Sequence, residues 1–205
     1  ISGYSTMIPD NLSDYYRLHA RFFDMSRWSF LFGRNSLPKL FPTLRKQAQI
    51  LDLGCGTGKH LKQLVQQYPQ ASITGIDLSE DMMGKIPVHI KERVDLINEE
   101  YTIESFEENQ FDLILASYSL SMFSELNNGL IAIKKHLKPD GYILVLDFDS
   151  TPHPWFSTWM AQNHVHFKDR LFKHLKEVFA TKKTESKKAY FGLYTYTAFL
   201  GINSK

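Results

Sequence analysis

The hydrophobic positions of this chain form short apolar runs separated by segments in which apolar and polar residues alternate with helical spacing. Runs that are apolar almost throughout are typical of strands buried on both faces of a sheet. Five runs have this character: residues 49–53, 72–77, 94–98, 111–117 and 142–148. Between the first two, residues 59–68 place Leu61, Leu64, Val65 and Tyr68 on one face and predict a helix.

Residues that favour the ends of helices predict further helices and, together with the strands, an α/β fold. Ser79, with Glu80 and Asp81 behind it, is suited to cap a helix, and a helix expected over 124–137 ends at the turn formed by residues 138–141. Strands that alternate with helices predict a Rossmann-like, doubly wound fold with a mostly parallel sheet.

The two ends of the chain differ from this alternating core. Residues 11–34 are helix-like and rich in aromatic residues, whereas 190–200 alternate small and aromatic residues and predict a late antiparallel strand. We therefore expect a single domain, consisting of an N-terminal helical lid segment, a cofactor-binding core and C-terminal helices with a strand: 1–47, 48–148 and 149–205.

Composition agrees with a globular protein. The chain has 205 residues, of which 43% are hydrophobic and 22% charged. It has no apolar run near the ~18 residues needed to span a bilayer and no signal-peptide pattern, so we expect a cytoplasmic protein, peripheral to the inner face of the membrane. Cys55 is the only cysteine, so no internal disulfide or cysteine-based zinc site can form.

The net charge of +2 is unevenly distributed. Residues 165–190 hold eight basic and three acidic residues, so this segment carries +5 and the remainder −3. We interpret it as a solvated helix face followed by a flexible lysine loop. The alternative is a surface that attracts an anionic membrane or a nucleic acid.

The first predicted strand runs into a glycine-rich turn, Asp52-Leu-Gly-Cys-Gly-Thr-Gly58. Ligands of open parallel sheets bind beyond the carboxyl ends of the strands. The spacing is G-x-G-x-G and not the G-x-G-x-x-G of dinucleotide sites. Asp52 would also repel a pyrophosphate and attract an amino group, so the turn favours a different nucleoside ligand.

Asp77 follows the second strand, 19 residues after Gly58. A carboxylate at that position can accept hydrogen bonds from both hydroxyls of a ribose. The alternative is a helix-capping acid.

Together these residues resemble the class I S-adenosylmethionine-dependent methyltransferases. Four segments carry the resemblance, which covers about residues 48–148: Ile50–Gly58, Gly75–Met83, Phe111–Ile114 and Leu137–Gly141. It implies S-adenosylmethionine as cofactor, with the three turn glycines at its methionine part, Asp77 at its ribose and Met82 near its adenine. Glu100 is the candidate for the adenine amine, with a plain surface acid as the alternative, and Cys55 is expected to be a small structural residue. The full set of implied cofactor residues is Asp52, Gly54, Cys55, Gly56, Gly58, Asp77, Leu78, Met82, Glu100, Tyr101 and Ser117.

Three further stretches resemble bacterial betaine-lipid N-methyltransferases, which methylate diacylglyceryl-homoserine and have relatives acting on phosphatidylethanolamine. These stretches are residues 15–34, 117–122 and 147–156. The resemblance implies N-methylation of an amino head group of a lipid. The candidates to orient the amine or cover the sulfonium are Tyr15, Tyr16, Tyr118 and Asp147, with His19 as a base. The aromatic residues of 15–34 suit a lipid interface, or a lid helix over the core.

The sequence leaves other functions open. They are methylation of a soluble small molecule or a quinone precursor, and a non-catalytic protein that binds S-adenosylmethionine. We expect no nucleic-acid partner, because Ser117-Tyr-Ser-Leu120 stands where an Asn-Pro-Pro-Tyr motif for a base amine would lie. We also expect no metal, because His164 and His166 have no acidic cluster near them and methyl transfer from a sulfonium needs none.

Overall fold

A computed structural model of the chain describes residues 30–162, 165, 167 and 171–204. Residues 33–205 form one compact unit. The candidates Tyr15, Tyr16 and His19, most of the helix expected over 11–34, and the pair His164 and His166 lie outside the described residues. The core predicted over 48–148 is described in full.

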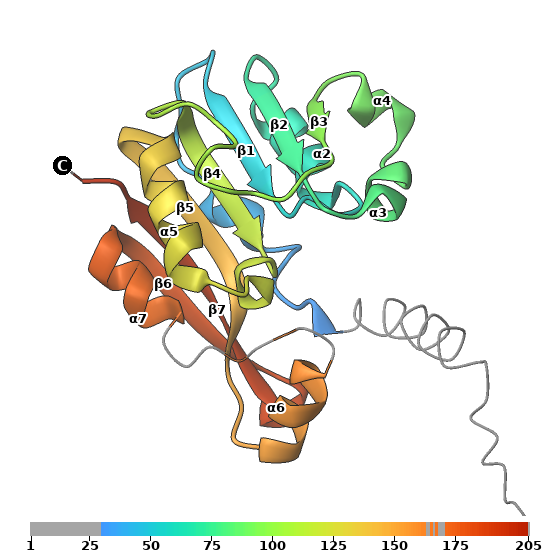
Figure 1. The fold of residues 1–205 in the computed structure, drawn as a ribbon, viewed down its shortest axis with the longest axis vertical. Helices are drawn as coiled ribbons and strands as arrows, with labels where there is room; N and C mark the ends of the chain where they lie inside the picture. The colour runs from blue at the N-terminus through green and yellow to red at the C-terminus, as the bar shows by residue number, and fades with distance from the viewer. Residues whose placement is uncertain (1–29, 163–164, 166, 168–170, 205) are drawn as a thin grey trace, which may run out of the picture. The chain divides into compact units, whose positions relative to one another are not determined.

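The described chain forms a seven-stranded sheet in the order β3-β2-β1-β4-β5-β7-β6 (Figure 1). The strands are β1 (Gln49–Leu53), β2 (Ser72–Ile76), β3 (Asp95–Ile97), β4 (Phe111–Ser117), β5 (Leu137–Ser150), β6 (Ala180–Ala189) and β7 (Tyr194–Ile202). The first five strands pair in parallel, whereas β7 is antiparallel to both β5 and β6. The Rossmann-like, mostly parallel fold predicted from the sequence is therefore confirmed.

Helices lie between β1 and β2, between β2 and β3, between β4 and β5 and between β5 and β6. They are α2 (Lys59–Gln67), α3 (Glu80–Gly84), α4 (Val88–Lys91), α5 (Leu126–His136), α6 (Pro154–Ala161) and α7 (Leu171–Val178). Short 3-10 helices are η2 (Leu37–Leu40), η3 (Leu120–Met122) and η4 (Tyr190–Gly192). The predicted cap is present, because Ser79 Oγ accepts a 3.3 Å hydrogen bond from the amide of Met82.

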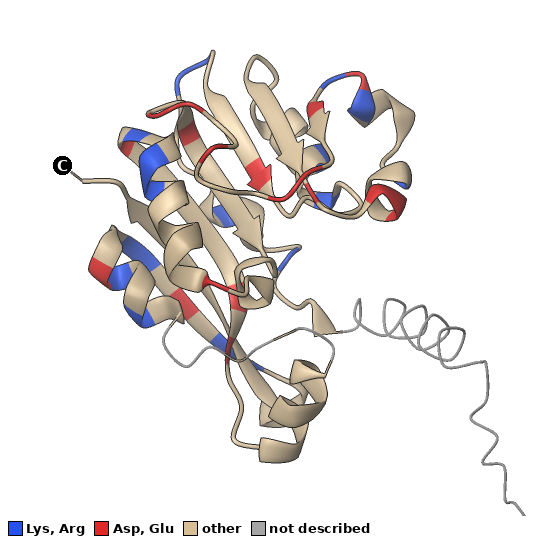
Figure 2. Cartoon of the chain, viewed as in Figure 1, with Lys and Arg blue, Asp and Glu red and all other residues tan. Residues whose placement is uncertain are grey.

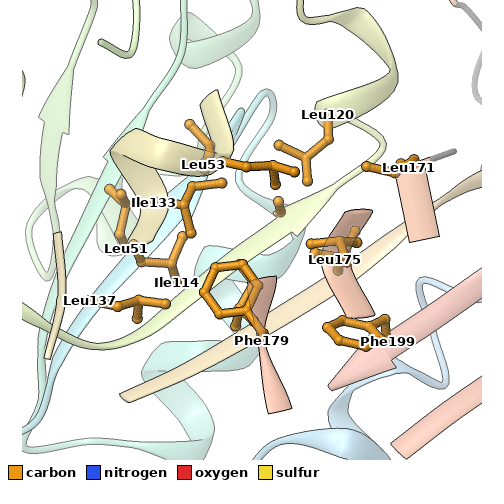
Figure 3. Packing of buried hydrophobic residues seen from close by; sticks show 14 of the residues in the cluster. Leu51, Leu53, Ile114, Leu120, Ile133, Leu137, Leu171, Leu175, Phe179 and Phe199 are labelled. Atoms are coloured by element: carbon orange, nitrogen blue, oxygen red, sulfur yellow. The ribbon is translucent and has the colours of Figure 1, made fainter. Parts of the chain in front are cut away.

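The main hydrophobic core lies between the sheet and the helices α5 and α7. Alternate residues of β1, such as Leu51 and Leu53, face this core beside Ile133 of α5 and Leu175 of α7 (Figure 3). Because side chains alternate along a strand, Asp52 faces the opposite side of the sheet. The core thus fixes which side of β1 carries the polar residues of the site.

Two parts of the C-terminal half differ from the sequence prediction. Most of the expected lysine loop is the edge strand β6, because its backbone pairs with β7 from Ala180 to Ala189. Strand β5 begins at Leu137 and not at Tyr142, because Leu137 already pairs with Phe111 of β4. None of the described helices is long and apolar enough to cross a bilayer.

Candidate active site

The glycine turn after β1 depends on conformations that residues with a side chain seldom adopt. Gly54, Gly56 and Gly58 have φ of 73°, 52° and 75°. A Cβ atom at Gly54 would lie 2.5 Å from Cβ of Ser119, so the loop after β4 packs directly on the turn. The amide of Gly54 donates a 2.9 Å hydrogen bond to the carbonyl of Ile76, which holds the turn beside the end of β2.

Two backbone amides, one from the turn after β1 and one from the residue before α3, hold the carboxylate of Asp77. Its Oδ2 accepts from the amide of Gly56 at 2.7 Å, and its Oδ1 accepts from the amide of Ser79 at 2.8 Å. Asn98, after β3, donates a 2.8 Å hydrogen bond to the carbonyl of Asp77. Each carboxylate oxygen can accept a further hydrogen bond, so this oriented acid can also bind a pair of hydroxyls.

Asp52 provides a buried acidic group under the turn. Its side chain is 1% exposed, and its Oδ2 accepts no hydrogen bond from any residue that the structure describes. Burial raises the pKa of Asp52 to about 7, against the lowering effect of the nearby Arg34 guanidinium. An orphaned carboxylate oxygen beside a glycine turn fits a ligand with an amino group, as S-adenosylmethionine has.

Arg34 and His60 complete this polar cluster, and sequence reasoning did not assign either to the site. His60 Nε2 lies 3.0 Å from Oγ of Ser117, and its Nδ1 lies 2.7 Å from Oε1 of Gln63. Burial, assisted by the charge of Arg34, lowers the pKa of His60 to about 3, so the ring is neutral. Its position just before Leu61, on the apolar face of α2, is a signal that could have identified a buried histidine.

Four other implied cofactor residues occupy different environments. Cε of Met82 would lie 3.2 Å from a Cβ at Gly56, so Met82 borders the turn. Leu78 is 70% exposed, and Glu100 is exposed as well. Tyr101 turns into the core instead, where its hydroxyl lies 2.8 Å from Nδ1 of His136 on α5. The structure therefore brings Met82 to the turn and gives Tyr101 contacts around α5.

Cys55 lies inside the turn but faces the sheet. It is 4% exposed, and a Cβ at Gly75 would meet its Sγ at 3.0 Å. Burial and the charges of Asp52 and Asp77 raise the pKa of its thiol. The side chain thus fills space between β1 and β2 as a protonated thiol.

Tyr118 lies in the loop after β4, and Asp147 lies in β5 beside that loop. Tyr118 is 3% exposed, and its ring packs on Phe148 with centroids 4.7 Å apart. Asp147 is fully buried, and its two oxygens accept from the amides of Ser121 at 3.0 Å and Phe148 at 2.8 Å. Burial raises the pKa of Asp147 to about 6, opposed by the hydrogen bonds from Ser121. Asp147 therefore links η3 to β5. Ser119, the residue that packs on Gly54, directly precedes η3.

Sequence comparison places this core among methyltransferase domains. Residues 50–141 match the family described as methyltransferase domain. A malonyl-[acyl-carrier protein] O-methyltransferase of Priestia megaterium is 36% identical over 107 residues, which are 50% of this chain and 38% of that protein. A demethylmenaquinone methyltransferase of Staphylococcus aureus is 29% identical over 150 residues, 72% of this chain and 59% of that protein. The chain thus spans between about two fifths and three fifths of the length of these curated relatives.

Solved structures share the fold at low sequence identity. The phosphoethanolamine N-methyltransferase 2 of Haemonchus contortus, in complex with S-adenosyl-L-methionine, has a TM-score of 0.68 and 17% identity, covering 84% of this chain and 52% of that one. A methyltransferase of Aquifex aeolicus has a TM-score of 0.62 and 20% identity, and the match covers 84% of this chain and 90% of that one. Residues 50–141 therefore match a methyltransferase domain, and the described chain shares its fold with solved methyltransferases.

Proposed function

We propose that this chain transfers a methyl group from S-adenosylmethionine to the amino head group of a lipid. The observation that carries methyl transfer is the convergence of the glycine turn, Asp77 and the unsatisfied Oδ2 of Asp52 at the carboxyl ends of β1 and β2. These groups suit the amino acid and ribose parts of one nucleoside ligand.

The chain's own residues would hold that ligand as follows. Asp77 would accept the ribose hydroxyls, since Gly56 and Ser79 already orient its carboxylate. Asp52 would accept from the ammonium group, and the small turn residues leave room for the methionine chain. When bound, S-adenosylmethionine supplies an electrophilic methyl group on sulfur.

An amine acceptor requires positioning more than acid-base chemistry, since a neutral amine needs only to point its lone pair at the methyl group. Tyr118 lies next to Ser119, the residue that packs on Gly54, and is our candidate to aim the amine. Both oxygens of Asp147 are used by backbone amides, so we assign it to holding this loop. Its effect on the acceptor would then act through Tyr118.

The lipid nature of the acceptor is supported by the aromatic stretch of residues 15–34 and by the stretches around Tyr118 and Asp147. A second candidate is a quinone precursor, favoured by the demethylmenaquinone methyltransferase that aligns with 72% of this chain. The candidate of another class is a protein that binds S-adenosylmethionine without transferring its methyl group.

Labelled methyl transfer from S-adenosylmethionine separates these functions. The protein is incubated with a fractionated lipid extract and, in parallel, with a soluble metabolite pool. We expect label in an amine-bearing lipid fraction. Label in a quinone fraction or in the soluble pool would support the second candidate. Tight cofactor binding by calorimetry without label in any fraction would support the non-catalytic protein.

A matched pair of variants tests whether transfer of the labelled methyl group depends on this site. Asp77→Ala removes the proposed ribose acceptor, whereas Asp81→Ala removes an exposed acid in the first turn of α3 with the same change of charge. We expect label to be lost in the first variant and kept in the second. Calorimetry with a nicotinamide dinucleotide is expected to show no binding, and tight binding of that ligand alone would overturn the proposal.

A further inference from the structure

The turn between β6 and β7 presents aromatic side chains in an unfavourable backbone conformation. Tyr190 and Phe191 have φ of 46° and 56°, in the left-handed region that glycine and asparagine tolerate best. Phe191 is also fully exposed, so its ring gains no burial against the described residues. Strain of this kind, without a packing benefit, indicates a function for the residue that bears it.

A second exposed aromatic residue lies on the element that packs against this turn. Trp155, in the first turn of α6, is 63% exposed, whereas its neighbour Phe156 is buried. Phe156 stacks on Tyr194, the first residue of β7, with centroids 5.8 Å apart and an interplanar angle of 17°. Thr151 Oγ1 donates a 2.6 Å hydrogen bond to the carbonyl of Leu193 in the turn. Helix α6 and the turn are thus held together at one end of the β6–β7 ribbon (Figure 1).

The exposed residues of this end are here called the aromatic tip: Trp155, Tyr190 and Phe191. The charged residues nearest to Tyr190 in sequence are Lys187 and Lys188, and Lys187 lies 3.9 Å from the carboxylate of Glu185. Segments 151–161 and 187–195 contain Lys187 and Lys188 and no Asp or Glu. Figure 2 shows α6 free of charged residues and basic residues along β6. Within the described part of the chain Lys188 forms no ion pair, and its stem would lie 3.9 Å from a Cβ at Gly192.

We propose that the aromatic tip docks on a membrane surface that carries anionic phospholipid. Indole and phenol rings favour the boundary between head groups and acyl chains, and lysines beside them are attracted to negative head groups. A protruding turn needs no preformed pocket on its partner, because lipids rearrange around an inserted ring. The proposal concerns binding alone and does not depend on the identity of the methyl acceptor.

Co-sedimentation of the full chain with lipid vesicles tests this docking. The vesicles are made of phosphatidylcholine, with or without phosphatidylglycerol. We expect recovery in the pellet to rise with phosphatidylglycerol and to fall with added salt, because salt screens exposed charges. Wild-type protein that stays in the supernatant with both vesicles would overturn the proposal, as would binding of the tip to a single-stranded nucleic acid but not to vesicles.

Two pairs of variants localise the contact. Phe191→Asn removes the ring and suits the left-handed backbone, so it should lower vesicle partitioning about 10-fold or more without loss of thermal stability. Its control is Ile131→Gln, at an apolar residue of α5 that is 57% exposed. Lys187→Gln with Lys188→Gln should weaken binding at least about fivefold, unlike Lys173→Gln with Lys176→Gln on α7.

The comparison between variants decides the result. Selective loss in Phe191→Asn and in the Lys187/Lys188 pair supports the aromatic tip as the contact. Wild-type partitioning of Phe191→Asn, or an equal loss in Ile131→Gln, would show that the vesicles bind another part of the chain and would overturn it.

Discussion

The backbone amide of Gly56 donates a 2.7 Å hydrogen bond to Oδ2 of Asp77, joining two motifs that are 21 residues apart in sequence. The acid at the end of β2 therefore also shapes the glycine turn at the end of β1. A change at either residue is expected to affect both halves of the cofactor site.

Asp77→Ala is expected to weaken binding of S-adenosylmethionine at least about 10-fold. The substitution removes charge-assisted hydrogen bonds to the ribose, each worth about 1.5–3 kcal/mol, and releases the amide of Gly56. Calorimetry on folded protein measures the affinity, with Asp81→Ala as the control of equal charge. An affinity equal to that of the wild type would place the ribose elsewhere.

Gly54→Ala is expected to lower the free energy of unfolding by roughly 2–4 kcal/mol. The new methyl group would meet Ser119 at 2.5 Å, and the φ of 73° is unfavourable for alanine. Gly84→Ala in α3 is the control, since a Cβ there meets nothing within 4 Å, and it should stabilise the protein by up to about 1 kcal/mol. Urea denaturation of both variants measures the difference, and equal effects would contradict the proposed packing.

Asp52 should make the stability of the ligand-free protein depend on pH. Its pKa is raised from 3.8 to about 7 on folding, so its contribution is complete below pH ~4 and is lost as the pH rises through 7. The unfolding free energy of the wild type should therefore fall relative to that of Asp52→Asn between pH 4 and 7, by a few kcal/mol in order of magnitude. Urea titrations across this range measure the difference. Parallel curves for the two proteins would show that folding does not raise the pKa of Asp52.

Tyr118→Phe and Asp147→Asn are expected to reduce turnover while the affinity for S-adenosylmethionine changes by less than about threefold, ~0.7 kcal/mol. The reason is that both residues shape the loop after β4 and neither belongs to the glycine turn. Tyr142→Phe, five residues before Asp147 in β5, is the control. A collapse of cofactor affinity would assign the two residues to the cofactor site, and unchanged turnover would leave them without a role in the acceptor pocket.

The strands of the core and the cofactor motifs could be predicted from the sequence because their signals are local. Apolar runs mark buried strands wherever they occur, and the glycines at 54, 56 and 58 reflect backbone angles set within the turn itself. Ser79 was likewise recognisable as a cap from its immediate neighbours.

Other features were decided by residues far apart in the chain. The lysine-rich segment 180–189 has no strand pattern of its own, and it is a strand because β7 offers it a hydrogen-bonding edge. Tyr101 was expected among the cofactor residues from its position after β3, and its contact with Nδ1 of His136, 35 residues away, could not be read from the sequence. The burial of Arg34 and His60 beside Asp52 likewise depends on how β1 and α2 pack. Packing of the whole sheet determines which distant segments pair and which side chains meet. A local sequence pattern therefore does not predict these contacts.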